Sequence, residues 1–204
     1  MAPSFCIELC ASERQQLLAI ARQSIHTGLH QGDALKVALH ELSVTLASHM
    51  GVFVTLMQGE RLRGCIGSMQ ASEPLAQSVA DSAFGAAFQD PRFPQLRLHE
   101  LDGIHIEISI LSPMTPLAVQ SREDLLDNLR PGSDGLLLED GRYRATFLPK
   151  VWEQLPSPDT FLEKLFDKAG LPTDHWSPTL RLYRYHTVCL SEAEVACKPI
   201  DSER

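Results

Sequence analysis

The chain has 204 residues, of which 44% are hydrophobic and 22% are charged, a composition that indicates a globular protein and argues against intrinsic disorder. Its formal net charge at pH 7 is −8, whereas nucleic acids and anionic membranes are bound mainly through clustered lysines and arginines. We therefore expect neither nucleic acid nor a membrane among its partners.

The sequence carries no sign of export. No apolar run approaches the roughly 20 residues of a membrane-spanning helix, and the first residues lack the basic segment and apolar run of a signal peptide. The five cysteines form no Cys-x-x-Cys pair, so free thiols in a reducing compartment are expected. We predict a cytoplasmic protein. No set of four residues has zinc-type spacing, so we expect no metal and no other cofactor.

Two helices and a hairpin are predicted at the start of the chain. A capping box at Ser12–Gln15 precedes an apolar stripe over Leu17–Leu29. A second helical pattern covers 33–48. The β-branched and apolar segment Gly51–Met57 is followed by a turn and by Arg61–Gly67, which is the pattern of two antiparallel strands.

The middle of the chain predicts a helix, an irregular loop and a strand. Ser72 is expected to cap a helix that continues to about Ala87, and the small residues of this helix indicate close approach to another backbone. The two prolines of Asp90-Pro-Arg-Phe-Pro94 exclude regular structure there. In Ile104–Leu111 four isoleucines alternate with other residues, which predicts a half-buried strand.

The last third of the chain completes an α+β pattern. Its expected elements are a short helix at Ser121–Leu129, a hairpin around Asp140-Gly141, a helix from Ser157 to Gly170 and a strand at Thr179–Leu190. Hairpins with helices between them, but without regular βαβ alternation, indicate a mainly antiparallel sheet flanked by helices. No linker-like boundary is evident.

The most distinctive segment is Leu62-Arg63-Gly64-Cys65-Ile66-Gly67. Strict strand alternation puts Arg63 and Cys65 on one face and the two apolar side chains on the other. A guanidinium beside the thiol would raise its thiolate fraction. Gly64 and Gly67 remove bulk beside Cys65, so that a backbone or a ligand can come close. Alternatively, Cys65 is a buried small hydrophobe, Arg63 pairs with a carboxylate, and the glycines serve packing.

Two further pairs of side chains are candidates. His105 and Glu107 share the strand face opposite the isoleucines and would form an acid/base pair if that face lines a cleft, or an ordinary polar face if it meets solvent. Asp90 and Arg92 are either a ligand-facing ion pair, or an aspartate that caps the turn and an arginine that anchors it.

The distinctive segment resembles the signature of the AMMECR family. Further matching pieces follow in the family's order, among them Gly51-Val-Phe-Val-Thr-Leu, Asp90-Pro-Arg-Phe-Pro, Ile106-Glu-Ile-Ser-Ile-Leu-Ser-Pro, Phe147-Leu-Pro and Lys168-Ala-Gly-Leu. The resemblance spans about residues 10–190. It implies one AMMECR-like domain with a larger α+β sub-domain, a smaller β-rich sub-domain and a cleft between them, lined by the signature strand.

The chain's own proline-containing segments indicate where it divides, and the resemblance implies a set of partners. The border between the sub-domains would lie near Pro113–Pro116 or Pro131–Gly132, and residues 1–9 and 191–204 would be flexible. Prokaryotic members resemble protein A of the AmmeMemoRadiSam system, which implies a Memo-like protein and a radical-SAM enzyme as partners. Glu107 stands at a glutamate position of the family.

Two functions remain open at this point. The first is an enzyme, or an enzyme component, in which Cys65 is a reactive thiol and Arg63, Glu107 and His105 assist. Its substrate would be a small molecule or a protein side chain, bound with the help of the neighbouring glycines and the Asp90–Arg92 loop. The second is a non-catalytic module that presents the same cleft to a protein or a small ligand.

Overall fold

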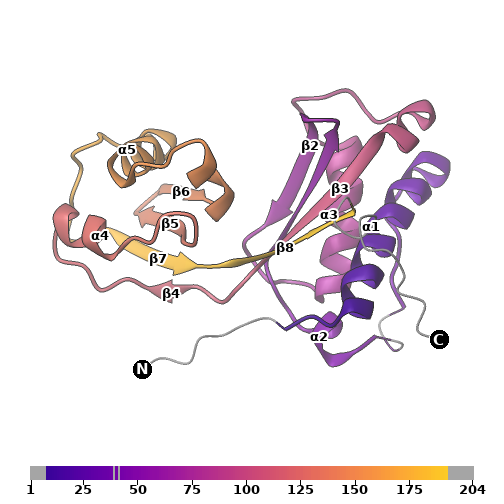
Figure 1. The fold of residues 1–204 in the computed structure, drawn as a ribbon, viewed down its shortest axis with the longest axis horizontal. Helices are drawn as coiled ribbons and strands as arrows, with labels where there is room; N and C mark the ends of the chain where they lie inside the picture. The colour runs from indigo at the N-terminus through magenta and orange to yellow at the C-terminus, as the bar shows by residue number, and fades with distance from the viewer. Residues whose placement is uncertain (1–7, 39, 41, 193–204) are drawn as a thin grey trace, which may run out of the picture. The chain divides into compact units, whose positions relative to one another are not determined.

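The computed structural model describes residues 8–38, 40 and 42–192, and the chain divides into two compact units (Figure 1). The first unit comprises Met1–Leu111 and Val188–Arg204, and the second comprises Ser112–Thr187. Each unit contains a four-stranded sheet with helices beside it, which confirms the predicted α+β class and the mainly antiparallel strands. Most of the termini for which flexibility is predicted lies outside the described residues.

The sheet of the first unit has the strand order β2-β1-β3-β8. Its members are β1 (Val52–Gln58), β2 (Arg61–Ser68), β3 (Ile104–Leu111) and β8 (Thr187–Ser191). The predicted hairpin is confirmed, and its tight turn uses Gly59 at φ 59°, a left-handed conformation that favours glycine. The alternation predicted for β3 is also confirmed, because its four isoleucines are buried.

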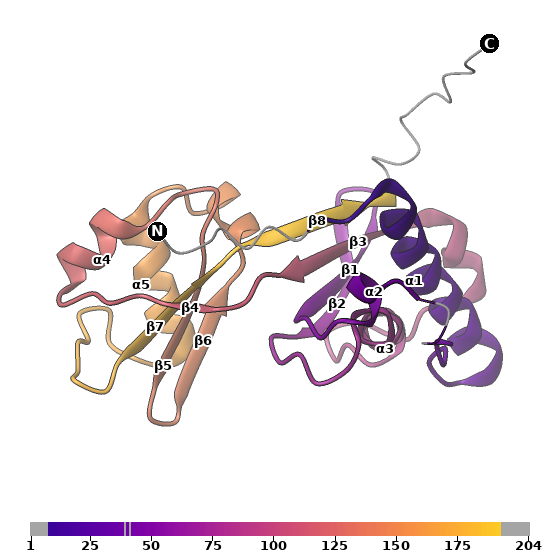
Figure 2. The same cartoon turned by 90° about the horizontal axis from the view of Figure 1, so that it is seen from below.

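Helices α1 (Ala11–Gln31) and α3 (Leu75–Phe88) lie side by side on one face of this sheet (Figures 1 and 2). Helix α3 begins after Pro74, so the predicted cap at Ser72 is wrong. The predicted close approach of a backbone is confirmed, because a β-carbon on Gly64 would lie only 2.0 Å from a carbonyl oxygen of α3.

The cap of α1 differs from the predicted one. The helix begins at Ala11, so Ser12 is already inside it, and the cap is Cys10. The Glu13 carboxylate accepts a hydrogen bond from the Cys10 backbone N–H at 2.9 Å, and this carboxylate at a helix N-terminus takes the place of the predicted glutamine. The predicted helix itself is confirmed, and it ends at Gly32 in the left-handed conformation.

The helix predicted over 33–48 is wrong for most of the described residues. Only α2 (Val44–Ala47) is α-helical there, after the capping residue Ser43. Residues 34–38 have non-helical backbone, and the Val37 N–H donates to the Gln77 side chain at 3.0 Å. A tertiary hydrogen bond to a side chain of α3 therefore replaces an intrahelical one. The apolar residues of this segment have the spacing of a helix but pack against the core without forming one.

The second unit has a sheet of strand order β4-β7-β5-β6. Its strands are β4 (Thr115–Pro116), β5 (Gly135–Asp140), β6 (Tyr143–Phe147) and β7 (Arg181–Tyr185). The hairpin around Asp140-Gly141 is confirmed. The strand predicted at Thr179–Leu190 is instead two strands, β7 and β8, which belong to different sheets.

The helices of the second unit are α4 (Arg122–Asn128) and α5 (Pro158–Ala169), both as predicted, and a 3-10 turn, η3 (Pro149–Glu153). The rings of Trp152 and Phe161 stack at 3.8 Å in the apolar core of this unit. In the first unit another 3-10 turn, η2 (Leu98–Gly103), leads into β3. Within the described part of the chain, none of the helices combines the length and the apolar character needed to cross a membrane.

Candidate functional site

Cys65 lies in a cross-strand row on the face of the first sheet that α1 and α3 do not cover. In the register of the three strands, Thr55 of β1 pairs with Cys65 on one side and with Glu107 on the other. Directly paired residues share a face, so the thiol and the Glu107 carboxylate belong to one row, with their Cα atoms about 10 Å apart. His105 lies two residues along β3 on the same face.

The thiol of Cys65 is half-buried and has a specific partner. The Thr55 hydroxyl donates a hydrogen bond to Cys65 Sγ at 3.3 Å. Thr55 is not among the residues that the sequence singles out. The hairpin pattern alone would not have found it, because the register counted from the turn places Val54 opposite Cys65, and an irregularity between Leu56 and Met57 shifts the partner to Thr55.

A β-bulge changes the predicted faces of the signature strand. Thr55 pairs with Cys65, but two residues further along β1 Met57 pairs with Leu62. Arg63 is therefore an extra residue in β2. Because Thr55 and Met57 share a face of β1, Leu62 shares the face of Cys65, and the prediction of strict alternation is wrong here.

Arg63 is paired with Glu100 and does not take the predicted position beside the thiol. Its guanidinium is buried and donates to both carboxylate oxygens of Glu100, at 2.8 and 3.2 Å. This hydrogen bonding lowers the pKa of Glu100 below its ordinary value, against the opposing effect of burial. The alternative prediction, a pair between Arg63 and a carboxylate, is therefore observed.

Asp90 and Arg92 hold the backbone of Cys65. The Cys65 N–H donates to Asp90 Oδ2 at 2.9 Å, and Arg92 Nη2 donates to the Cys65 carbonyl at 3.2 Å. Because β2 is the outermost strand in the order of its sheet, these two side chains take the place of a neighbouring strand at Cys65. We call this arrangement the Asp90–Arg92 clamp.

The two members of the clamp are also paired with each other. Arg92 Nε and Nη2 donate to the Asp90 carboxylate at 2.9 and 2.7 Å. This pairing holds the pKa of the buried Asp90 carboxyl well below its usual range, although burial opposes the shift. The pKa of Arg92 is raised, first by Asp90 and to a smaller extent by the nearby Cys65. The guanidinium that contacts Cys65 is thus that of Arg92, which lies 27 residues away in sequence and donates to the Cys65 carbonyl oxygen.

The two glycines of the signature make room for the protein's own backbone. A β-carbon on Gly64 would meet the carbonyl oxygen of Ala86, and one on Gly67 would lie 2.2 Å from the carbonyl oxygen of Val52. Of the two predicted uses of this space, close approach of a backbone is the observed one.

Two surface depressions of the first unit lie away from the thiol. The larger, of about 580 Å³, is lined by Ala19, Arg22, Gln23, His26, Leu101, Asp102 and Ile104. The smaller, of about 140 Å³, is lined by Met50, Val52, Ser68, Gln70, Ser72, Glu73, Ser78, Asp81 and Ser82. Among the residues that the structure describes, no group of three or more His, Cys, Asp or Glu side chains could hold a metal ion.

The protein therefore has an α+β fold of two units, in which the signature strand carries a thiol and is held by the Asp90–Arg92 clamp. The chain belongs to the AMMECR1 family, whose family model matches residues 18–190. It is 37% identical over 190 residues to a protein of Methanothermobacter thermautotrophicus, covering 90% of this chain and 96% of the relative. It is 34% identical over 167 residues to protein MJ0810 of Methanocaldococcus jannaschii, covering 78% and 81% of the two chains.

A solved structure has the same fold. The crystal structure of the uncharacterised protein PH0010 from Pyrococcus horikoshii is similar to this chain with a TM-score of 0.77 and 32% sequence identity. The similarity covers 85% of this chain and 88% of that one. The resemblance to the AMMECR family that the signature indicates is therefore confirmed.

Proposed function

We propose that this AMMECR1-family protein is an enzyme, or an enzyme component, that uses Cys65 as a reactive thiol. One observation carries the proposal: a half-buried sulfur, on a sheet face that the helices of its unit leave uncovered, accepts a hydrogen bond from Thr55 while the Asp90–Arg92 clamp fixes its backbone. Nucleophilic catalysis by cysteine requires an activated thiol, and a hydroxyl that donates to the sulfur would stabilise the thiolate.

Each neighbouring group has a distinct part in this proposal. The Thr55 hydroxyl and the Arg92 guanidinium would stabilise negative charge on the sulfur. Glu107, in the same cross-strand row, is the candidate acid/base, and His105 is a second one. Arg63 would act only indirectly, by holding η2 beside the signature strand through Glu100.

The thiol can be tested within the protein by alkylation. Cys10 and Cys189 are exposed and serve as internal references for Cys65. Iodoacetamide at limiting dose, followed by mass spectrometry of peptides, should label Cys65 at least as fast as the two references despite its lower exposure. Thr55→Val keeps the shape and removes the hydroxyl, and it should slow labelling of Cys65 several-fold without affecting Cys189. A Cys65 that reacts only after unfolding would refute the proposal.

A second function is favoured by the internal pairing around Cys65. Arg63 is bonded to Glu100, and Asp90 to Arg92, so these charges are occupied within the protein. A non-catalytic module would present the same face to a protein or a small ligand. Cys65→Ser separates the two functions, because it abolishes thiol chemistry but leaves the shape of the face nearly unchanged.

The partners are proposed from the family resemblance alone. A Memo-like protein and a radical-SAM enzyme would act with this chain on a small molecule or a protein side chain. An affinity pull-down that compares the wild type with Cys65→Ser, read by mass spectrometry of proteins and metabolites, tests this. Enrichment of both proteins by wild type and variant supports the binding module, and a ligand retained only by the wild type supports the enzyme.

A further inference from the structure

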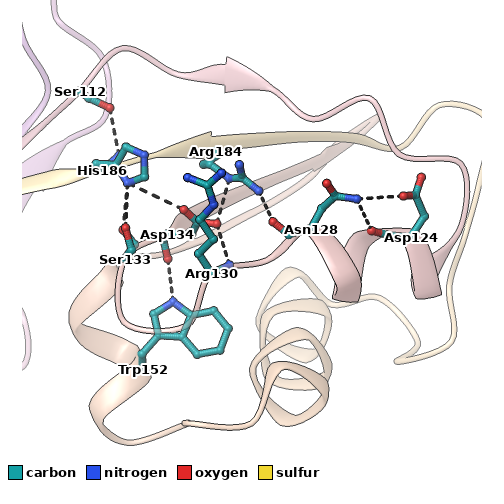
Figure 3. A network of polar contacts seen from close by, with 9 residues as sticks. All are labelled: Ser112, Asp124, Asn128, Arg130, Ser133, Asp134, Trp152, Arg184 and His186. Atoms are coloured by element: carbon teal, nitrogen blue, oxygen red, sulfur yellow. Dashed lines mark hydrogen bonds and ion pairs between the residues drawn. The ribbon is translucent and has the colours of Figure 1, made fainter. Parts of the chain in front are cut away.

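A buried carboxylate in the second unit has one oxygen without a partner. Asp134 is fully buried just before β5 (Figure 3). Its Oδ2 accepts a hydrogen bond from the Arg130 N–H at 2.9 Å and lies 2.9 Å from Arg184 Nε in an ion pair. Its Oδ1 has no hydrogen-bond partner among the described residues. A buried, unpartnered carboxylate oxygen is costly, so it calls for an explanation.

That oxygen faces the ring of His186. His186 Nδ1 lies 3.8 Å from Asp134 Oδ1 and 3.1 Å from the carbonyl oxygen of Ser133 (Figure 3). The Ser133 hydroxyl lies farther from Nδ1, at 3.4 Å. A carbonyl oxygen can only accept, so we assign the proton of the neutral ring to Nδ1, where it makes the shorter of the two contacts. In the neutral ring the other nitrogen, Nε2, then carries the lone pair. The side chain is 48% exposed, so a substrate in solution can reach it.

The backbone around the ring is fixed from two sides. The His186 N–H donates to Ser112 Oγ at 3.0 Å, and the Ser112 N–H donates to the His186 carbonyl at 2.9 Å. The Trp152 indole N–H donates to the Asp134 carbonyl at 2.7 Å, which holds the loop that carries the carboxylate. All of these residues belong to the second unit. The arrangement therefore does not depend on Cys65.

We propose that His186 is a general base for a substrate that carries a hydroxyl or thiol group. The proton moves from the substrate O–H or S–H to Nε2, and the electron pair of that bond stays on the substrate oxygen or sulfur. The ring becomes an imidazolium, and its Nδ1–H can then donate a hydrogen bond to the unpartnered Asp134 Oδ1 while the proton stays on the ring. Asp134 is the positioning residue of this pair.

The unpartnered oxygen is placed to accept a hydrogen bond from the ring once the ring has taken up the substrate proton. Arg184 already balances one charge of Asp134 through Oδ2, and Ser133 accepts the Nδ1 proton of the neutral ring. A purely structural histidine would need only the Ser133 contact. When the ring is an imidazolium, its Nδ1–H can donate to this carboxylate oxygen. That hydrogen bond stabilises the charged state formed during proton transfer, as in other His–Asp pairs.

The first test reads the tautomer of the wild-type protein. Two-bond hydrogen–nitrogen correlation NMR on protein with ¹⁵N-labelled histidine distinguishes a proton on Nδ1 from one on Nε2. We expect the Nδ1–H tautomer for neutral His186. An Nε2–H tautomer would overturn the proposal, and this result does not depend on whether any variant folds.

The second test measures the nucleophilicity of Nε2 with diethyl pyrocarbonate, whose carbonyl carbon is attacked by the ring nitrogen as ethyl carbonate leaves. His26, an exposed histidine of α1, is the reference. His186 should be modified faster than His26, and Asp134→Asn should slow it roughly tenfold, the effect of losing one charge-assisted hydrogen bond. Ser133→Ala retains the carbonyl and should change the rate less than twofold. Equal rates for the two histidines, or no change in a folded Asp134→Asn variant, would contradict the assignment.

Discussion

Replacing Asp90 by asparagine should destabilise the first unit strongly. The buried carboxylate accepts hydrogen bonds from the Cys65 N–H and from three N–H groups of Arg92. The amide side chain introduced by Asp90→Asn has the same shape as the carboxylate but only one acceptor oxygen and no charge. Loss of a buried charge-assisted pair costs about 3 kcal/mol. For a chain of this length that corresponds to a fall in Tm of about 6–12 °C.

The pH dependence of this effect follows from the sign of the pKa shift. The pKa of Asp90 is held well below its usual range by Arg92. A carboxyl with a lowered pKa in the folded state stabilises the fold above its unfolded pKa of about 3.9, and this contribution is lost as the pH falls further. The difference between wild type and Asp90→Asn should therefore be full at pH 7 and shrink below about pH 4.

The assay is thermal and urea denaturation followed by far-UV circular dichroism, which reports mainly the helices of the first unit because α1 and α3 are the longest helices. Asp102→Asn is the matched control, because Asp102 is an exposed carboxylate in η2, and its effect should stay within about 0.5 kcal/mol. A loss below about 1 kcal/mol for Asp90→Asn would refute the view that the clamp secures the signature strand. A loss that is equally large at pH 3 and pH 7 would refute the electrostatic reason.

Two further predictions concern packing and the second unit. Gly64→Ala should cost about 3 kcal/mol, because its β-carbon would collide with the Ala86 carbonyl. Gly59→Ala meets no atom and should cost about 1 kcal/mol for its left-handed φ. Urea denaturation of both variants checks these values. Asp140 accepts hydrogen bonds from Thr179 and Ser177 and pairs with His175, which lowers its pKa to about 2. The stabilising effect of the Asp140 carboxylate should therefore be present above about pH 4 and be lost towards pH 2. Acid unfolding of wild type and Asp140→Asn, followed by tryptophan fluorescence, checks this. The wild type should be the more stable of the two only at the higher pH.

Local patterns predict the elements that local physics determines. The isoleucine alternation of Ile104–Leu111, the apolar stripe of α1 and the hairpin turns need only neighbouring residues, and each is found where it is expected. The segment 33–48 has helical spacing but is held in a non-helical conformation by tertiary hydrogen bonds such as that from Val37 to Gln77. Propensity is a weak guide where such contacts compete with it.

The site is harder to predict because its contacts are distant in sequence. The motif draws attention to Cys65, but the guanidinium that holds its backbone comes from a loop that no local rule connects to β2. The bulge at Arg63 is set by the pairing of two strands. The adjacent Gly64 can mark a bulge, but a glycine in a strand equally indicates the close approach of a backbone or a ligand. Likewise, no breaker residue at His186 signals that one apparent strand is divided between two sheets.

The order of the two units along the chain has a consequence for synthesis on the ribosome. The second unit is one continuous segment, whereas β8, which completes the first sheet beside β3, comes from the last part of the chain. Contacts between segments far apart in sequence form late, and chains fold during synthesis from the N-terminal end. We therefore expect the second unit to close while the first still lacks its last strand, so that a nascent chain stalled before Val188 holds one finished unit and one open sheet edge.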